Sequence, residues 1–432
     1  MTLFVKPGLT KCKKNINIPA GNEAMAPQKS AKGRGNEMNR LILVVLICCC
    51  CLALEPLAWA GGNILPGGTI GGAASLGRGG ASNAVVGDGS AFYHNVANIA
   101  GTQFLEFDLS TLVSRSWYQG SDCPDGQNSE LGLSPVPLMA LTNRLGPNWT
   151  IGTAIYGSDG IGVQHKKGPY RKSLLTSVNF TTAIAYNNDD NTFSAGFGAD
   201  VVYGQLSCRG IFDQLGIAVT PVDVTNDLDG IGYGWRLGVR QEFTEWLTAS
   251  LSYSPPRKLK LRGSSDIALF DLELGRLKAE TEINFPGKLG LGLLLKPAET
   301  VRVSVDADLN LYDLEKINLD FGLFQLAQIT EWKSNPSVKV GVEKDFNANW
   351  TGRAGAGILW PAIPIEHRTR TIPDGLGFHG ALGGTWTNDA KDFAIDFAVG
   401  VSGADGEVIS PMGEGQTKNR IGYAAIAARW LF

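Results

Sequence analysis

The strongest constraint on the fold of this 432-residue chain is a two-residue alternation of apolar and polar side chains that recurs from about residue 102 onward. In the stretch 301–314, Val301 and Val303 share one face with further apolar residues, whereas Arg302 and other polar residues share the opposite face. A period of two is typical of a β-strand that separates an apolar from a polar environment. The same alternation recurs in 193–204 and 392–403.

The connections between the alternating stretches are short and long in turn. Short polar turns lie at 143–148, 187–191, 243–246, 296–300, 345–350 and 387–392. Long links lie near 113–134, 158–174, 205–230, 257–282, 313–334, 361–376 and 403–418. Transmembrane barrels of bacterial outer membranes have short turns at the periplasmic end and long loops at the outer end. The pattern therefore predicts an all-β fold: a transmembrane antiparallel β-barrel of about 14 strands over residues 103–432.

The predicted strands lie near 103–112, 135–145, 148–157, 175–187, 192–204, 231–243, 246–256, 283–296, 300–312, 335–345, 349–360, 377–386, 391–402 and 419–432. The second is the weakest, because Pro135 and Pro137 suit an edge or a bulge. A soluble β-sandwich also alternates with period two, but it does not need aromatic residues at strand ends. Here tryptophans lie at or near such ends: Trp149, Trp246, Trp350, Trp360, Trp386 and Trp430. The chain also ends in Phe432, which resembles the assembly signal of outer-membrane barrels.

An apolar run at 41–60 precedes this region and has the features of a secretory signal peptide. Arg40 gives a basic start, and Ala58 and Ala60 match the small residues of a cleavage site. A transmembrane helix is the alternative, but the apolar core is short and Glu55 interrupts it. We expect residues 38–60 to be the signal peptide, and residues 1–37 to be a mis-assigned or disordered extension before a start at Met38.

Removal of residues 1–60 changes the charge and the cysteine content. Eight of the 38 basic and three of the 41 acidic residues are lost, which leaves 30 and 38, a net charge of about −8. This acidic balance argues against a nucleic-acid partner. Of seven cysteines only Cys123 and Cys208 remain, on the first and third long links. Two cysteines in an exported chain permit one disulfide, and two free thiols are the alternative.

The segment 61–102 is rich in glycine, alanine and serine and has neither a helical nor a strand period. A barrel of about 14 strands encloses a lumen that its own side chains do not fill. Irregular backbone is tolerated at membrane depth only where protein shields it from lipid. We therefore expect this segment to be a plug inside the lumen, with apolar anchors at Phe92, Tyr93, Val96 and Ile99. A flexible periplasmic leader is the alternative.

Three stretches carry a resemblance to a known family. The segment contains Gly77-Arg78-Gly79, then Asp88, then Asn95-Val96-Ala97. The stretches 247–263 and 370–386 add a strand that enters a large outer loop and an Ile-Pro-Asp turn before a late strand. Together these resemble the FadL family of outer-membrane transporters of long-chain fatty acids and aromatic hydrocarbons. The chain departs from the family pattern at Val96, where members have proline.

The resemblance implies passive uptake of a hydrophobic small molecule through the outer membrane. In the family the ligand is captured on the outer loops and moves to a pocket beside the N-terminal hatch. A shift of the hatch releases it through a gap formed by a kinked strand. Ile64 and Leu65 correspond in position to the hatch end that fills the pocket. The implied partners are this ligand and outer-membrane lipid, and we expect a monomer without a cofactor.

Two features of the barrel region suit such a ligand. The apolar stretches 211–219 and 319–329 are candidates for the capture groove, with loop packing as the alternative. The strand pattern points basic residues inward, namely Arg236, Arg240, Arg302, Lys339 and Arg353. Arg236, Arg302 and Lys339 are candidates for binding a ligand carboxylate. Their alternative role is to pair with inward carboxylates such as Asp200, Asp306, Glu343 and Asp396.

Other functional classes have weaker support. A barrel enzyme such as a lipase would need a nucleophile with a base, but no Gly-x-Ser-x-Gly motif occurs. The four histidines His94, His165, His367 and His379 lack metal-ligand spacing, so we expect no metal site. A structural or adhesin barrel would not need a movable plug, and a non-specific porin would need an open, charged lumen. We therefore expect a transporter and not an enzyme.

Overall fold

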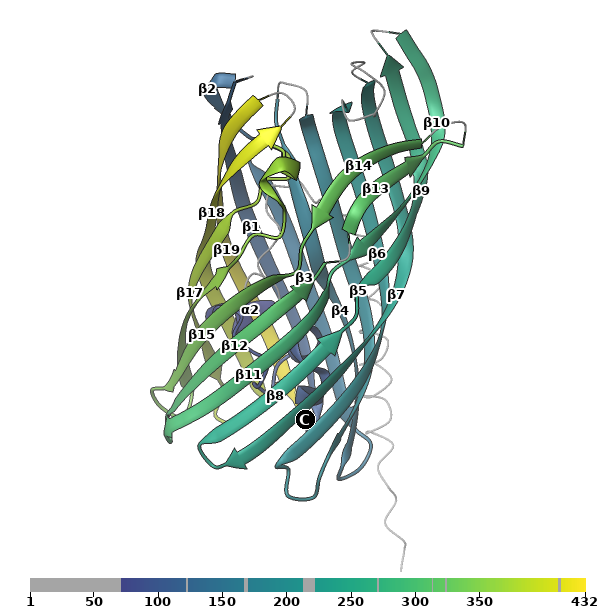
Figure 1. Ribbon diagram of the computed structural model, residues 1–432. Coiled ribbons are helices and arrows are strands. Elements are labelled where there is room, and N and C mark those ends of the chain that lie inside the picture. Colours follow the sequence, from purple (N-terminus) through teal and green to yellow (C-terminus); the bar gives the residue numbers. More distant parts are fainter. Residues whose placement is uncertain are drawn as a thin grey trace, which may run out of the picture. The chain divides into compact units, whose positions relative to one another are not determined.

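The computed structural model describes residues 71–121, 123–166, 170–212, 222–269, 272–312, 314–322, 325–410 and 413–432. Within them, fourteen strands form a closed antiparallel barrel (Figure 1). These wall strands are β1 (Phe104–Gly120), β3 (Gly132–Arg144), β4 (Trp149–Gln164), β5 (Tyr170–Asn187), β6 (Phe193–Phe212), β7 (Val222–Thr244), β8 (Leu247–Ser254), β11 (Gly287–Ala298), β12 (Val301–Leu311), β15 (Asn335–Asp345), β16 (Trp350–Leu359), β17 (Leu376–Thr387), β18 (Phe393–Ser410) and β19 (Gly413–Leu431).

Each wall strand pairs with the next in this order. The last strand, β19, pairs with β1 from Phe104↔Leu431 to Gly120↔Gly415, which closes the ring. The predicted barrel is therefore confirmed, because every wall strand has a neighbour on both sides.

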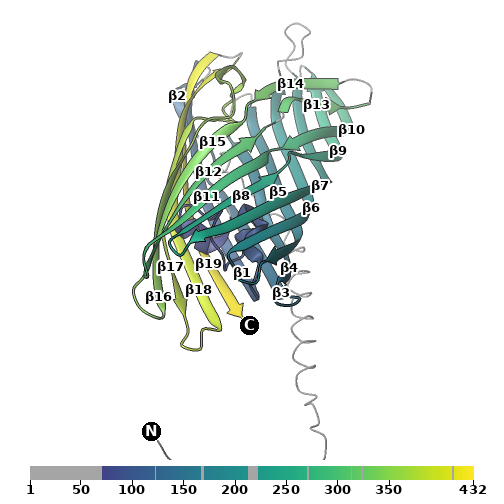
Figure 2. The same ribbon diagram turned by 60° about the horizontal axis from the view of Figure 1, so that its bottom comes forward.

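The predicted long links contain more regular structure than expected. They hold β2 (Cys123–Asn128), β9 (Arg257–Leu269), β10 (Leu272–Phe285), β13 (Leu314–Asp320), β14 (Gln325–Trp332) and the 3-10 helix η2 (Ile365–His367). β9 pairs with β7 and with β10, so the wall continues beyond the level at which β8 ends (Figures 1 and 2). Part of what the sequence predicted as loop is thus an extension of the wall.

Prolines explain why the bounds of two predicted strands differ from those observed. The predicted strand 246–256 ends at Ser254, before Pro255 and Pro256, and the predicted strand 283–296 is divided at Pro286 between β10 and β11. Proline cannot donate a backbone hydrogen bond, so it interrupts the ladder between neighbouring strands. At this level the partner of β7 changes from β8 to β9.

The two faces of the wall differ as the alternation predicts. On β18, Val399 and Val401 point outward and are 57% and 67% exposed, whereas the inward-facing Asp396 and Ala398 are buried. Apolar side chains on the outer face suit lipid, and polar side chains on the inner face suit a lumen. Exposed tryptophans lie near the ends of wall strands, as predicted: Trp149, Trp246, Trp350, Trp360 and Trp430.

Residues 71–102, hereafter the N-terminal segment, contain three short helices. These are α2 (Gly72–Gly77), α3 (Ala91–His94) and the 3-10 helix η1 (Val96–Ile99). Both views show α2 within the ring of wall strands (Figures 1 and 2). Apolar residues of the segment pack on inward-facing wall residues. Phe92, Val96 and Ile99 join a buried cluster with Leu138 and Tyr156.

Candidate functional site

The Gly-Arg-Gly motif brings the backbone of the N-terminal segment directly against the backbone of the wall. Gly79 has φ +63°, and a Cβ there would lie 2.7 Å from the backbone nitrogen of Ala356. A Cβ on Gly77 would lie 3.2 Å from Cα of Gly383. Glycine is needed at residue 79 both for the left-handed backbone and for this close approach.

Wall carboxylates accept hydrogen bonds from the backbone of the segment. Asp306 Oδ2 accepts from the backbone nitrogens of Ser82 and Asn83, at 2.7 and 2.8 Å. Asp108 Oδ2 accepts from the nitrogen of Ala73 at 2.5 Å. Glu106 contributes a similar bond to Gly89 at 3.0 Å. Because the segment forms little helix, these bonds satisfy amide groups that would otherwise be buried without partners.

Arg78 and Asp88, the two charged residues of the motif, bind each other inside the segment. Arg78 Nη2 donates to Asp88 Oδ2 at 2.7 Å, and both side chains are buried. Arg78 Nη1 also lies 3.5 Å from Glu343 on β15. Burial raises the pKa of Asp88, but the positive charges of Arg78 and Arg429 lower it by more. The net effect is a pKa below the usual value. The segment is thus attached to the wall through a buried, charged network.

The third part of the motif forms a capped turn. The Asn95 side chain accepts from the nitrogen of Ala97 at 3.0 Å and donates to the carbonyl oxygens of Asn83 and of Val239 on β7. Asn95 has an extended backbone, φ −157° and ψ 108°, and Val96 begins η1. Proline fits the first position of a helix after an extended residue. Val96 therefore occupies a position that would also accept the family's proline.

The candidate carboxylate-binding cations are all paired with wall carboxylates. Arg236 Nη2 lies 2.7 Å from Asp200 Oδ2, and Lys339 Nζ binds Asp308. Arg302 Nη1 lies 2.6 Å from Asp345 Oδ2. The two further inward cations also bind acids, Arg240 with Glu242, and Arg353 with Glu343 and Asp396. Each of these cations thus forms an ion pair with a wall carboxylate, while binding of a ligand carboxylate by Arg236, Arg302 or Lys339 stays a prediction.

Two other inward cations keep unused hydrogen-bonding capacity, and the sequence analysis missed both. Within the described residues, Lys288 Nζ has no hydrogen-bond partner and lies 4.8 Å from the ring centroid of Tyr93. Arg257 donates from Nη2 to Asp159 at 3.1 Å, but its buried Nε and Nη1 have no partner. Lys288 could have been identified as an inward cation from its parity on the predicted strand 283–296.

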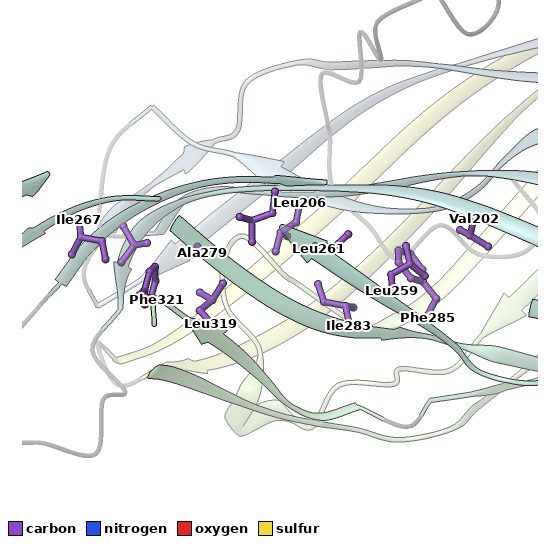
Figure 3. Packing of buried hydrophobic residues seen from close by; sticks show 12 residues of the cluster. Val202, Leu206, Leu259, Leu261, Ile267, Ala279, Ile283, Phe285, Leu319 and Phe321 are labelled. Atoms are coloured by element: carbon purple, nitrogen blue, oxygen red, sulfur yellow. The ribbon is translucent and has the colours of Figure 1, made fainter. Parts of the chain in front are cut away.

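Beyond these cations, toward the end of the barrel with the long links, the inner face of the wall becomes apolar. A cluster of twelve buried residues, hereafter the apolar cluster, lies along β6, β7, β9, β10, β13 and the residue after β13 (Figure 3). Its members are Val202, Leu206, Val224, Leu228, Leu259, Leu261, Ile267, Ala279, Ile283, Phe285, Leu319 and Phe321. Leu319 and Phe321 come from the predicted apolar stretch 319–329. Much of the other stretch, 211–219, lies outside the described residues.

The opposite, outward face of the same strands is charged. Arg262 on β9 pairs with Glu280 on β10 at 2.8 Å, and Lys258 with Glu282 at 3.2 Å, with all four side chains largely exposed. Exposed ion pairs are not compatible with the hydrocarbon of a bilayer. This part of the wall therefore extends beyond the hydrocarbon region, at the end with the long links, and the apolar cluster with it.

The ladder between β3 and β4 covers only part of β3. β3 pairs with β1 from Gly132 to Thr142, but its register with β4 runs only from Leu138↔Tyr156 to Arg144↔Thr150. The β3–β4 ladder thus ends before the stretch Gly132–Pro137 is reached. Pro135 and Pro137 lie in this stretch and cannot donate to a neighbour. β4 has a bulge nearby, where its register with β5 shifts between Gly157 and Gly160.

The disulfide that the sequence left open is absent. Cys123 and Cys208 both have free thiols. Cys123 lies on β2, opposite Gly120 of β1, whereas Cys208 lies on β6 against the apolar cluster and 4.0 Å from Ser173 Oγ. Their strands pair with different neighbours, so the link positions assumed from the sequence do not bring the thiols together.

Some of the predicted features lie outside the described residues, and some other features are absent within them. The candidate ligand-binding residues Ile64 and Leu65, like the predicted signal peptide, lie outside the described residues. Among the residues that are described, no helix is both long and apolar enough to cross a membrane. The same part of the chain contains no group of three side chains suited to hold a metal ion.

Comparison with known proteins identifies the family. Residues 53–423 match the family model described as outer membrane protein transport protein (OMPP1/FadL/TodX). No curated protein matches the sequence. The fold is similar to that of a FadL homologue from Pseudomonas aeruginosa, with TM-score 0.76 and 15% identity over 86% of this chain and 100% of the other.

Two transporters with solved structures are also similar. The Pseudomonas putida toluene transporter TodX gives TM-score 0.68 and 16% identity over 84% of this chain and 98% of the other. The Ralstonia pickettii toluene transporter TbuX gives TM-score 0.64 and 19% identity over the same shares. At these identities the structures show the fold, while the family model covers most of the chain. The chain therefore belongs to the OMPP1/FadL/TodX family of outer-membrane transport proteins, which are not enzymes.

Proposed function

We propose that this protein takes up a hydrophobic molecule with an acidic head group, such as a long-chain fatty acid, by passive diffusion through the barrel. The observation that carries the proposal is the apolar cluster: twelve buried apolar residues on the inner face of a wall region whose outer face is charged. An apolar surface above the bilayer can take a poorly soluble molecule out of water, because burial of apolar area is favourable.

The acidic head group is inferred from Lys288 and Arg257. Both side chains are inward, and both keep nitrogen atoms without hydrogen-bond partners in the described part of the chain. A buried cation without a full set of partners is costly, and a ligand carboxylate would supply charge-assisted hydrogen bonds. Tyr93 of the N-terminal segment lies beside Lys288. The ligand would therefore lie with its head near the segment and its chain toward the apolar cluster.

We further propose that residues 61–102 act as a hatch that controls release. Support comes from the nature of the attachment, which uses the carboxylates of Asp306, Asp108 and Glu106 on short backbone bonds. Polar attachments can exchange with water, so a shift of the segment costs less than pulling apart an apolar core. The proposed exit toward lipid lies beside β3 before Leu138, where the ladder between β3 and β4 has ended.

Uptake of labelled oleate and toluene tests the function. The chain is expressed in a Gram-negative host that lacks its own transporter of this family. Oleate uptake should exceed that of the empty vector, and the double variant Lys288→Gln, Arg257→Gln should reduce it about tenfold, the loss of roughly one charge-assisted contact. Lys260→Gln, on the outer face of β9, is the matched control.

The two ligands separate the alternatives. If the wild type transports toluene but not oleate, the ligand is a neutral hydrocarbon and the two cations have a structural role. If neither compound enters faster than with the empty vector, the uptake proposal is wrong.

A further inference from the structure

A second cluster of basic side chains lies on the outer face of the barrel, away from the lumen. Arg115 of β1 stands directly opposite Arg420 of β19, and Lys418 stands opposite Trp117 two residues farther along. All three basic residues are exposed. We call Arg115, Lys418 and Arg420 the cation patch.

The position of the cation patch follows from the register. The next outward-facing residues toward the short-turn end are Val113 of β1 and Val401 of β18. Both pair with Gly422, and they are 41% and 67% exposed. Trp430 lies ten residues after Arg420 along β19, at the short-turn end. Ten residues of a strand tilted by about 40° rise about 25 Å, the height of the apolar band of an outer-membrane barrel. The patch therefore lies at the outer border of the hydrocarbon region.

The charges of the patch are only partly compensated. Arg420 Nη2 donates to Asp405 Oδ2 on β18 at 3.2 Å, and Asp405 also stands opposite Lys418, so one carboxylate faces two of the three cations. Arg115 forms neither an ion pair nor a hydrogen bond with any described side chain, and Lys418 Nζ lies 5.0 Å from the ring of Trp117. Like charges placed directly opposite on neighbouring strands are destabilising. The next acidic residue on β18 is Glu407, which lies two residues beyond Asp405 and farther from the membrane.

We propose that the cation patch binds the phosphate groups of a phosphorylated glycolipid, lipopolysaccharide, in the outer leaflet. Arginine and lysine at a membrane surface each attract anionic lipid, and the planar guanidinium matches phosphate oxygens in pairs. The exposed apolar residues Val113, Leu133 and Val401 beside the patch would contact the acyl chains. The inference depends on the barrel and its membrane level and not on the transported ligand.

Lipid binding by the purified, folded protein in detergent micelles tests this inference. The probes are bisphosphorylated lipid A, monophosphoryl lipid A and inorganic phosphate, and native mass spectrometry counts the bound lipid. The double variant Arg115→Gln, Lys418→Gln leaves the Arg420–Asp405 pair intact. It should bind bisphosphorylated lipid A about 25-fold more weakly, roughly fivefold for each cation removed.

The matched control is the double variant Lys258→Gln, Arg262→Gln, which removes two exposed basic residues that are already paired with glutamates. It should bind lipid A as the wild type does, and heat-modified gel migration should show that both variants are folded. The inference is overturned if the two double variants lose binding equally or if neither loses it. It is also overturned if millimolar inorganic phosphate alone displaces the lipid, because the patch would then be a site for free phosphate.

Discussion

The two halves of β7 show how one strand serves two environments. In its membrane-level half, Arg236 points inward into a buried ion pair while Leu237 and Val239 point outward and are exposed. In its outer half the parity is unchanged but the polarity is reversed. Leu228 points inward into the apolar cluster, and Asp229 points outward.

The difference shows that alternation identifies which face of the wall a residue lies on. Its height relative to the bilayer decides whether that face must be polar or apolar. Lipid surrounds the first half, so the outer face is apolar and the lumen holds the charges. Water and polar head groups surround the second half, so apolar residues turn inward. The polar half holds the N-terminal segment, and the apolar half offers a surface for a hydrophobic ligand.

The largest expected effect is in the polar half. Arg78→Ala leaves Asp88 buried without its close partner, which typically costs about 3–5 kcal/mol. Docking of the N-terminal segment should weaken by that amount, measured as faster amide hydrogen exchange across residues 71–101. Ion conductance through the barrel should rise as well. Unchanged exchange would show that the Arg78 network does not hold the segment, and Lys258→Ala on the outer face is the control.

The second effect is in the apolar half. Leu261→Asn places an amide in the apolar cluster, and loss of about 2 kcal/mol of apolar burial should weaken binding of a fluorescent fatty acid about 30-fold. Lys260→Asn, the next residue on the outward side of β9, should leave binding unchanged. Equal losses in the two variants would mean that the inner face is not the ligand surface.

A smaller effect is expected from pH in the polar half. Burial, together with Lys288, Lys339, Arg78 and Arg236, lowers the pKa of His94 well below its usual value. The docked segment then holds a neutral histidine, while an undocked one takes up a proton below about pH 6.5. Stability is therefore full above that pH, and undocking should grow about tenfold for each pH unit below it.

The matched variant His94→Gln isolates this effect. Carboxylates of the lumen titrate as well, so the measurement is the difference in pH slope of amide exchange between wild type and variant, from pH 7 to pH 5. The variant should have the shallower slope. Identical slopes would mean that His94 stays accessible to protons in the docked segment.

The smallest effect is expected on the outer face of β9 and β10. Arg262→Ala removes one partner of the Arg262–Glu280 pair, whose side chains are 70% and 48% exposed. Exposed pairs contribute little because water and salt screen them. Neither fatty-acid binding nor the temperature of heat modification should change measurably. A clear loss of ligand binding would show that the outward face takes part in capture.

Much of the barrel follows from local sequence. The alternation in 301–314 and 392–403 predicted strands because side-chain direction in a strand depends only on residue parity. The Gly77-Arg78-Gly79 motif identified the N-terminal segment from the sequence alone. Parity does not reveal the height of a residue relative to the bilayer. The extension of the wall by β9 and β10 was therefore predicted as loop.

The sequence by itself thus determined the fourteen wall strands, their faces and the segment that contacts the lumen side of the wall. Only the tertiary structure decided how fully the inward cations are partnered: Arg236 and Lys339 meet acids on other strands, while Lys288 and Arg257 keep nitrogens without hydrogen-bond partners among the described residues. The reason is that the face of a residue is set by its immediate neighbours in the chain. A charge partner is set by strand register and by where the N-terminal segment lies, and both depend on residues far away in the sequence.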